Sequence, residues 1–355
     1  MSPAAGWDLL VSRDDLSTTE VRPTTPEPLA PGEVRLAIER FGITAVTATY
    51  ARFGDSPLQF LNVFQAPEGY GRVPVWGFAR VEESRAPEVE VGTRLFGYLP
   101  MSTHHTISPT PVDGGFLDTT PARDFQHPWY RTYELAPPDE QDDRKALLHP
   151  LYPASFNLNE FLGGHVAQGV TDVLITSASS KTAIGLAHLL AAREGVRTVG
   201  LTSTSNLAFV EGLGLYDSVV SYEDLADATV DGPTVFVDFT NSLDRIEEVY
   251  GQFGAYLTAT TLVGFTHPRL SFEPPRVENP TPELFFTPAV EQELIAQEGA
   301  MNYNRRYNDA ETEFFSNSAS WLTVHRGIGP QAIADAYRAA LAGKQPPDVA
   351  EVLIP

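Results

Sequence analysis

A strand, a tight turn of small residues, a helix and a second strand follow one another between residues 173 and 200. The apolar run Val173-Leu174-Ile175 leads into the turn 176–181 (TSASSK), and residues 182–194 carry apolar side chains at helical spacing. This order is typical of the first βαβ unit of a dinucleotide-binding fold, in which N–H groups at the helix start bind a diphosphate. The unit therefore predicts a parallel sheet with a ligand site beside this turn.

The glycines that usually form such a turn are absent. Ser177, Ser180 and Ala183 stand where a G-x-x-G-x-x-G pattern would place them. Ser180 must therefore either donate its hydroxyl to a phosphate or hold the ligand away from the backbone. Lys181 and Thr182 add an ammonium group and a hydroxyl at the helix start. The alternative is a serine-capped helix with a solvated lysine and no ligand.

A second phosphate-binding motif also has to be considered. Residues 180–182 (SKT) resemble the end of a P-loop, and residues 235–238 (VFVD) resemble a strand that ends in a magnesium-binding acid. A P-loop needs glycine where this chain has Ile175 and Ser180, and the turn is too short to surround a triphosphate. Nucleotide hydrolysis is therefore disfavoured.

Composition narrows the class of protein. The 355 residues suffice for two hydrophobic cores, and a net charge of −22 without a dense Lys/Arg cluster argues against nucleic acid as a partner. No apolar stretch approaches the roughly 18 residues of a membrane-spanning helix, and the N-terminus lacks a signal-peptide pattern. Without cysteine the chain has no disulfide, no thiolate nucleophile and no Cys-based zinc site. We expect a cytoplasmic protein that does not contact membranes.

The pattern of elements changes near residue 150. Before it, β-rich runs alternate with Pro/Gly turns, which is typical of a small antiparallel barrel. After it, strands alternate with helices, which is typical of a doubly wound parallel sheet. A last helix is expected to start at Gly329-Pro330 and to end at Gly343. The strands are expected at 33–38, 73–81, 93–98, 173–175, near 199, and at 219–220, 235–237 and 256–260.

These parts, in this order, resemble the medium-chain dehydrogenase/reductase superfamily, and specifically its zinc-free quinone-reductase and enoyl-reductase branch. Residues 29–36 (LAPGEVRL) look like the opening turn and strand of that branch, and residues 41–54 like the helix beside its active cleft. Residues 91–97 (VGTRLFG) and 212–222 (GLGLYDSVVSY) are similar to two further phrases of the branch, although Thr93 replaces an acid. Residues 125–133 match no part of it.

The resemblance implies an α/β protein with two domains. A GroES-like antiparallel β-barrel domain would comprise residues 1–150 and 286–355, and a doubly wound parallel Rossmann domain would comprise residues 151–285. It also implies an oxidoreductase and, because homodimers are common in the superfamily, makes a homodimer a reasonable expectation.

The end of the second strand bears on the choice of cofactor. Residues 201–206 (LTSTSN) contain no acid where an NAD-selective site places one against the ribose. A 2′-phosphate is then not repelled, and Ser203, Ser205 and Lys181 offer donors, so NADP(H) is favoured over NAD(H). The same polar run would also serve as a helix N-cap.

By resemblance, two later strand ends, 237–240 and 262–266, would face the adenine and the nicotinamide, although Asp238 equally suits a strand-end turn. The residues expected to bind the cofactor are Ser177, Ser179, Ser180, Lys181, Thr182, Ser203, Ser205, Asn206, Tyr222, Asp238, Phe239, Val263, Gly264 and Phe265.

Hydride transfer would need a side chain that donates a proton or polarises the substrate. Tyr50, on the helix beside the cleft, is the first candidate, followed by Tyr98 and His104. A phenol, with a reference pKa of about 10, stays protonated at neutral pH. Each tyrosine equally suits simple packing. His104 and His105 are adjacent, so on a strand they point to opposite faces and chelate one ion poorly; no metal is expected.

The function expected from these residues is the NADPH-dependent reduction of a carbonyl or an activated C=C bond in a small, partly apolar substrate. Two alternatives stay open. One is a cofactor-independent lyase or hydrolase on the same scaffold, which the replacement of all three glycines suggests. The other is a non-catalytic NADPH-binding protein.

Overall fold

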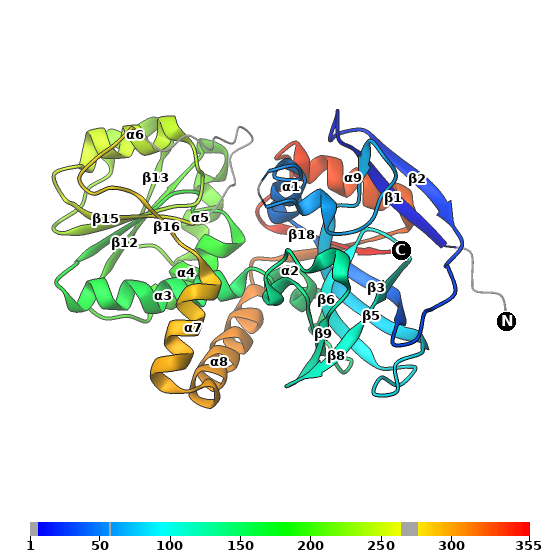
Figure 1. Ribbon diagram of the computed structural model, residues 1–355. Coiled ribbons are helices and arrows are strands. Elements are labelled where there is room, and N and C mark those ends of the chain that lie inside the picture. Colours follow the sequence, from blue (N-terminus) through cyan, green and yellow to red (C-terminus); the bar gives the residue numbers. More distant parts are fainter. Residues whose placement is uncertain (1–5, 57, 264–275) are drawn as a thin grey trace. The chain divides into compact units, whose positions relative to one another are not determined.

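The computed structural model describes residues 6–56, 58–263 and 276–355. The chain forms two compact units (Figure 1). The first unit comprises Met1–Pro150 and Thr323–Pro355, and the second comprises Leu151–Leu322.

The first unit is built mainly from antiparallel strands, as its β-rich runs predict. Its strands are β1 (Gly6–Ser12), β2 (Thr19–Thr24), β3 (Val34–Ile43), β4 (Tyr70–Gly71), β5 (Pro74–Ser84), β6 (Arg94–Pro100), β7 (His104–Ile107), β8 (Pro109–Val112), β9 (Gly115–Asp118), β10 (Thr132–Leu135), β17 (Thr323–Ile328) and β18 (Val349–Ile354). The larger sheet has the order β17-β18-β3-β5-β6-β10-β9-β8, with β7 also on β3, and the smaller has the order β2-β1-β4.

Helices of the first unit connect and cover these strands. They are α1 (Ala45–Arg52), α2 (Asp142–Leu148) and α9 (Gly329–Leu341), with 3-10 turns η1 (Phe60–Asn62), η2 (Pro121–Arg123) and η3 (Pro128–Tyr130). Because α9 joins β17 to β18, this pair runs parallel and departs from the antiparallel prediction. Residues 41–43, which the resemblance placed in a helix, end β3 instead, and Phe41 and Ile43 are buried there.

The second unit contains the predicted parallel sheet. Its strands are β11 (Asp172–Ile175), β12 (Arg197–Thr202), β13 (Ser218–Ser221), β14 (Thr234–Asp238), β15 (Leu257–Leu262) and β16 (Glu283–Leu284). The order β13-β12-β11-β14-β15-β16 is the dinucleotide-binding order, and it reverses direction between β11 and β14. All neighbouring pairs are parallel. The doubly wound prediction is therefore confirmed.

Helices cover both faces of this sheet (Figure 1). The helices of this unit are α3 (Tyr152–Ala167), α4 (Lys181–Ala191), α5 (Leu207–Leu213) and α6 (Leu243–Phe253), with 3-10 turns η4 (Thr204–Asn206) and η5 (Tyr222–Asp227). Two further helices, α7 (Thr287–Glu298) and α8 (Ala300–Ser318), pack against α3 and extend away from the sheet. Along the described ranges, none of the helices combines the length and apolar character that crossing a bilayer requires.

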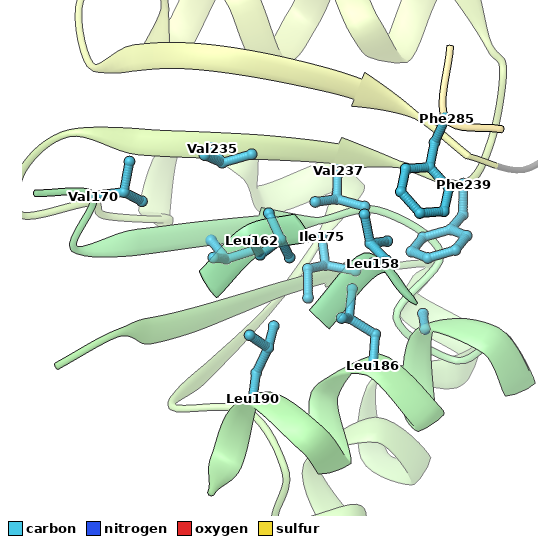
Figure 2. Packing of buried hydrophobic residues seen from close by; sticks show 12 residues of the cluster. Leu158, Leu162, Val170, Ile175, Leu186, Leu190, Val235, Val237, Phe239 and Phe285 are labelled. Atoms are coloured by element: carbon cyan, nitrogen blue, oxygen red, sulfur yellow. The ribbon is translucent and has the colours of Figure 1, made fainter. Parts of the chain in front are cut away.

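Side-chain alternation along β11 divides the core between the two faces. Val173 and Ile175 pack with α3 and α4, where Figure 2 shows Leu158, Leu162, Leu186 and Leu190. The intervening residue Leu174 packs on the other face with α6. Both faces are therefore buried, which explains why the strands are almost continuously apolar.

Residues 286–322, which the sequence analysis placed with the first domain, lie in the second unit. Aromatic side chains of α8 hold this segment on α3. Phe314 stacks on Tyr152 with ring centroids 5.3 Å apart, and Tyr303 meets Phe156 at 5.7 Å. The aromatic density noted late in the chain therefore serves packing of the parallel-sheet unit.

Candidate functional site

The turn between β11 and α4 lies where the strand order reverses, at the carboxyl edge of the sheet. Ser177 adopts a left-handed backbone with φ of 48°, a conformation more common for glycine. Its N–H donates to Tyr222 Oη at 2.7 Å. Ser180 is the N-cap of α4, and its Oγ accepts from Ala183 N at 3.3 Å. Serine thus takes over two positions of the missing glycine pattern without breaking the turn.

Backbone hydrogen bonds fix this turn to the neighbouring strand. Ala178 N donates to Leu201 O at 3.0 Å, and Ser180 N donates to Ser177 O at 2.7 Å. Close approach is possible because Gly200 lies on β12; a Cβ there would come within 3.0 Å of Ala178 Cβ. The space that glycine usually provides within the turn is thus provided by glycine on the adjacent strand.

The start of α4 offers the groups that a diphosphate requires. Lys181 and Thr182 occupy the first helical turn, where backbone N–H groups lack an intrahelical acceptor. They follow Ser180 directly in sequence, and the side chains of all three residues are partly exposed. A helix N-terminus, a cation and hydroxyl donors fit a phosphate ligand.

The end of β12 lies against the same turn. Asn206 Nδ2 donates to Ser179 Oγ at 3.0 Å, and the hydroxyls of Ser203 and Ser205 lie 2.9 Å apart. Hydrogen bonds therefore bring together Ser177 with Tyr222, and Ser179 with Asn206, four of the predicted cofactor residues. We identify Ser177, Ser179, Ser180, Lys181, Thr182, Ser203, Ser205, Asn206 and Tyr222 as the nucleotide-site candidates.

Three other predicted cofactor residues have different surroundings. Asp238 is fully buried, and its carboxylate accepts from Thr176 Oγ1 at 2.6 Å and from Asn241 N at 2.7 Å. Burial raises the pKa of Asp238, and these hydrogen bonds oppose the rise. The contacts favour its interpretation as a strand-end turn residue.

The ring of Phe239 lies in the hydrophobic core (Figure 2). Val263 packs partly against the same core, and its N–H donates to Asp238 O at 2.8 Å. Gly264 and Phe265 lie outside the described residues.

Two charged residues near the turn were not predicted. The Arg245 guanidinium lies over the Tyr222 ring, 4.5 Å from its centroid. Burial raises the pKa of Tyr222 to about 12. Glu223 Oε2 accepts from Thr204 Oγ1 at 2.7 Å, so an acid does reach the end of β12, but from η5, the 3-10 segment that follows β13. Sequence spacing from β12 could not reveal it, because the contact arises from the pairing of β13 with β12.

In the first unit, aromatic side chains gather around the predicted donors. We call this group the tyrosine cluster; it consists of Tyr50, Phe60, Trp76, Tyr98, Trp129 and Tyr130. Tyr50 and Tyr98 meet edge to face, with ring centroids 5.3 Å apart. Trp76 Nε1 donates to Tyr50 Oη at 3.1 Å. The structure therefore brings two of the three predicted donors together.

Burial keeps both phenols protonated. It raises the pKa of Tyr50, and the nearby Tyr130 adds to the rise while the Trp76 hydrogen bond opposes it. Burial likewise raises the pKa of Tyr98 well above its usual value. Within the described chain, the buried Tyr98 hydroxyl makes no hydrogen bond of ordinary length and geometry. Two neutral phenols can donate to an oxygen that gains negative charge.

The third predicted donor, His104, does not join them. Its Nε2 lies 3.2 Å from Glu82 Oε2, and its Nδ1 lies 2.9 Å from Thr103 Oγ1. The adjacent His105 points the other way and meets Phe64, which contacts Tyr98. Burial lowers the pKa of His105 well below its usual value, and Arg123 and Arg72 add to this effect.

The sequence contained a signal for this orientation. His105 alternates with the buried Ile107 on β7, so it belongs to the inward face, whereas His104 does not. In the described ranges, no three His, Asp or Glu side chains gather closely enough to hold a metal ion.

Replacing Tyr98 with phenylalanine tests the state of its hydroxyl. We expect the free energy of unfolding to rise by about 1 kcal/mol, because the variant removes a buried hydroxyl that makes no hydrogen bond of ordinary length and geometry with the described residues. Tyr133→Phe is the matched comparison, since Tyr133 Oη donates to Tyr98 O at 2.7 Å and accepts from Arg123. The free energy of unfolding of Tyr133→Phe should fall by about 1–3 kcal/mol. Urea unfolding checks both values, and equal losses in the two variants would contradict the assignment.

A buried ion pair anchors the segment that carries Trp129 and Tyr130. Arg123 Nη1 lies 2.8 Å from Asp118 Oδ2, and Arg123 Nη2 donates to Tyr130 O at 3.0 Å. Asp118 also accepts from Ser108 N and from Thr120 N. This segment overlaps residues 125–133, which matched nothing in the sequence analysis. Its role in the fold is to place two aromatic rings in the tyrosine cluster.

Comparison with solved structures supports the two-unit fold. CurA from Vibrio vulnificus is 14% identical, with a TM-score of 0.59 and 98% of each chain covered. Mycobacterial Rv1454c, solved with NADPH, is 18% identical, with a TM-score of 0.56 and coverage of 99% of this chain and 100% of the other. A quinone oxidoreductase from Pseudomonas syringae pv. Tomato DC3000 is 15% identical, with a TM-score of 0.57 and the same coverages. The predicted fold, an antiparallel unit with a Rossmann unit, is confirmed.

Sequence comparison identifies the family of the chain. No curated protein sequence matches the chain significantly. The family model described as "Protein of unknown function (DUF2855)" matches residues 41–346. Because these residues make up most of the chain, the protein belongs to the DUF2855 family.

Proposed function

We propose that the protein is an NADPH-dependent oxidoreductase that reduces a carbonyl or an activated C=C bond in a small, partly apolar substrate, without zinc. The observation that carries this proposal is the serine-lined turn between β11 and α4, at the reversal point of a sheet with dinucleotide-binding strand order. The NADPH-bound Rv1454c and the P. syringae quinone oxidoreductase, which share the fold, support the choice of cofactor and reaction class.

The second unit would hold the dinucleotide. The first turn of α4 would bind the diphosphate through backbone N–H groups, with the hydroxyls of Ser180 and Thr182 as further donors. Lys181 would neutralise phosphate charge. Ser203, Ser205 and Asn206, at the end of β12, would contact the ribose side. These roles rest on donor chemistry and on position along the sheet edge.

The first unit would supply the proton donors. Bound NADPH supplies the hydride. Tyr50 would donate a hydrogen bond to the substrate oxygen as negative charge develops there, and Trp76 would hold the Tyr50 hydroxyl in place. The hydroxyl of Tyr98 would be the second donor. The surrounding aromatic rings would exclude water and would suit a partly apolar substrate.

Titration of the protein with NADPH tests the proposal. We expect saturable stabilisation that reaches about 2.7 kcal/mol at a cofactor concentration 100 times the Kd. NADH should stabilise the protein less at equal concentration. Thermal unfolding and cofactor fluorescence measure both effects. If neither nucleotide binds, the cofactor-independent lyase or hydrolase becomes the better hypothesis. Binding without turnover of enones, quinones or aldehydes would favour the non-catalytic protein.

Replacing Lys181 with alanine tests the turn itself. We expect weaker binding of both nucleotides, because one phosphate contact is lost, and a larger loss for NADPH, which carries the additional 2′-phosphate. Arg305→Ala is the matched control, because Arg305 lies on α8, is largely exposed and pairs only with Asp309 among the described residues. Equal losses of NADPH and NADH affinity in Lys181→Ala would contradict a role toward the 2′-phosphate.

A further inference from the structure

Arg245 is a second cation near the turn to which the proposed function assigns the cofactor. It lies in the first helical turn of α6, the helix that follows β14. Its guanidinium covers the ring of Tyr222, whose hydroxyl accepts from Ser177 N at 2.7 Å. Ser177 follows β11, Tyr222 follows β13, and Arg245 lies in the helix after β14. Contacts among these three residues therefore connect the segments that follow the three strands.

The guanidinium of Arg245 has N–H donors that the described residues do not use. One of its five N–H groups donates to Glu248 Oε2 at 2.7 Å, and no other described residue accepts from it. The Glu248 side chain is 47% exposed, so this pair is weak and easily exchanged. Stacking on the Tyr222 ring fixes the orientation of the guanidinium plane. The N–H groups along the edge of that plane can then donate to a ligand. A planar fork of this kind binds a phosphate through two parallel hydrogen bonds.

Glu223 places an opposing charge beside this arginine. The hydrogen bond from Thr204 Oγ1 holds the pKa of the Glu223 carboxyl below its usual value, and the Arg245 charge acts in the same direction. Glu223 is therefore ionised at neutral pH. It adjoins Tyr222 in sequence and reaches the end of β12, the side on which dinucleotide-binding sheets hold the adenosine ribose. A carboxylate there accepts from ribose hydroxyls but repels a 2′-phosphate.

We propose that Arg245 binds the 2′-phosphate of NADPH and that Glu223 weakens this preference, so that the two side chains together set the discrimination between NADPH and NADH. This inference rests on the proposed function, because it assigns residues to the same nucleotide site. Lys181, at the start of α4, would neutralise the diphosphate, and its charge would add to the attraction of the 2′-phosphate. Arg245 lies at a different strand end and would supply the direct contact to the 2′-phosphate.

Calorimetric titration of the full chain with two probes tests the inference. Adenosine 2′,5′-bisphosphate carries the 2′-phosphate without a nicotinamide, and 5′-AMP lacks it. We expect the wild-type protein to bind the bisphosphate more tightly than 5′-AMP. In Arg245→Ala, binding of the bisphosphate should weaken roughly 10- to 100-fold while binding of 5′-AMP stays unchanged. Arg245→Lys should keep part of the preference, since charge is retained but the fork is lost. Arg305→Ala should match the wild type.

Glu223→Gln is the reciprocal variant. The amide oxygen still accepts from Thr204, but the negative charge is gone, so the bisphosphate should bind roughly two- to fivefold more tightly. If the wild type prefers the bisphosphate and Arg245→Ala retains that preference, the inference is overturned while the proposed function stands. If the wild type binds neither probe nor NADPH, both fail. Circular dichroism of each variant confirms that a change in binding is not a change in folding.

Discussion

Replacing Asp118 with alanine is expected to destabilise the first unit by about 3–5 kcal/mol, because it leaves a buried arginine without its counter-ion. The Asp118 side chain is fully buried and that of Arg123 is 3% exposed. Arg123 also donates to Tyr133 Oη and to Tyr130 O, so the loss extends to the segment that supports the tyrosine cluster. Urea unfolding followed by tryptophan fluorescence measures it, because Trp7, Trp76 and Trp129 all lie in this unit.

Two variants make this result specific. Asp118→Asn retains an acceptor for Ser108 N and Thr120 N but loses the charge. Its free energy of unfolding should lie between those of the wild type and the alanine variant. Asp124→Ala removes the partner of Arg131 at a side chain that is 66% exposed, and should cost less than about 1 kcal/mol. A loss in Asp118→Ala no greater than in Asp124→Ala would show that the buried pair does not anchor the segment.

The parallel sheet was predictable because its strands are buried on both faces. Val173, Leu174 and Ile175 read as one apolar run, and each of the strands β12, β13, β14 and β15 follows a helix or a 3-10 segment at similar spacing. Residues 286–322 were misplaced because nothing local distinguishes the faces of α8. Their assignment depends on Tyr152 and Phe156, which are about 150 residues earlier in the chain and pack on this helix.

Some of the nucleotide-site candidates were predictable from local sequence, and others depend on contacts between distant segments. Serine at position 180 was a predictable N-cap, because it directly precedes an apolar helical pattern. The roles of Tyr222, Arg245 and Glu223 arise from contacts between strand ends. Such contacts depend on which strands are neighbours, and a sequence pattern gives this only after the strand order is known. The absence of an acid after β12 was correctly observed, but the conclusion drawn from it omitted Glu223.

Replacing Tyr50 with phenylalanine is expected to lower kcat at least about 100-fold with any enone, quinone or aldehyde that the wild type reduces. The proposed role gives Tyr50 the proton that the substrate oxygen requires, and burial raises its pKa so that the proton is retained at neutral and mildly alkaline pH. The Kd for NADPH should not change, because in the proposal the second unit alone holds the dinucleotide. Steady-state oxidation of NADPH, measured beside a binding titration, separates these two effects.

Tyr337→Phe is the matched control for this substitution. Tyr337 is also fully buried in the first unit, and its hydroxyl donates to Leu16 O at 2.9 Å, outside the tyrosine cluster. Tyr337→Phe removes a phenolic oxygen, as Tyr50→Phe does, together with a structural hydrogen bond. Any general effect of removing a buried hydroxyl on kcat should therefore appear in this variant as well. Tyr98→Phe should lower kcat less than Tyr50→Phe, because it leaves Tyr50, the proposed proton donor, in place. A Tyr50→Phe enzyme with the kcat of Tyr337→Phe would make Tyr50 a packing residue, and Tyr98 would become the first candidate for the donor.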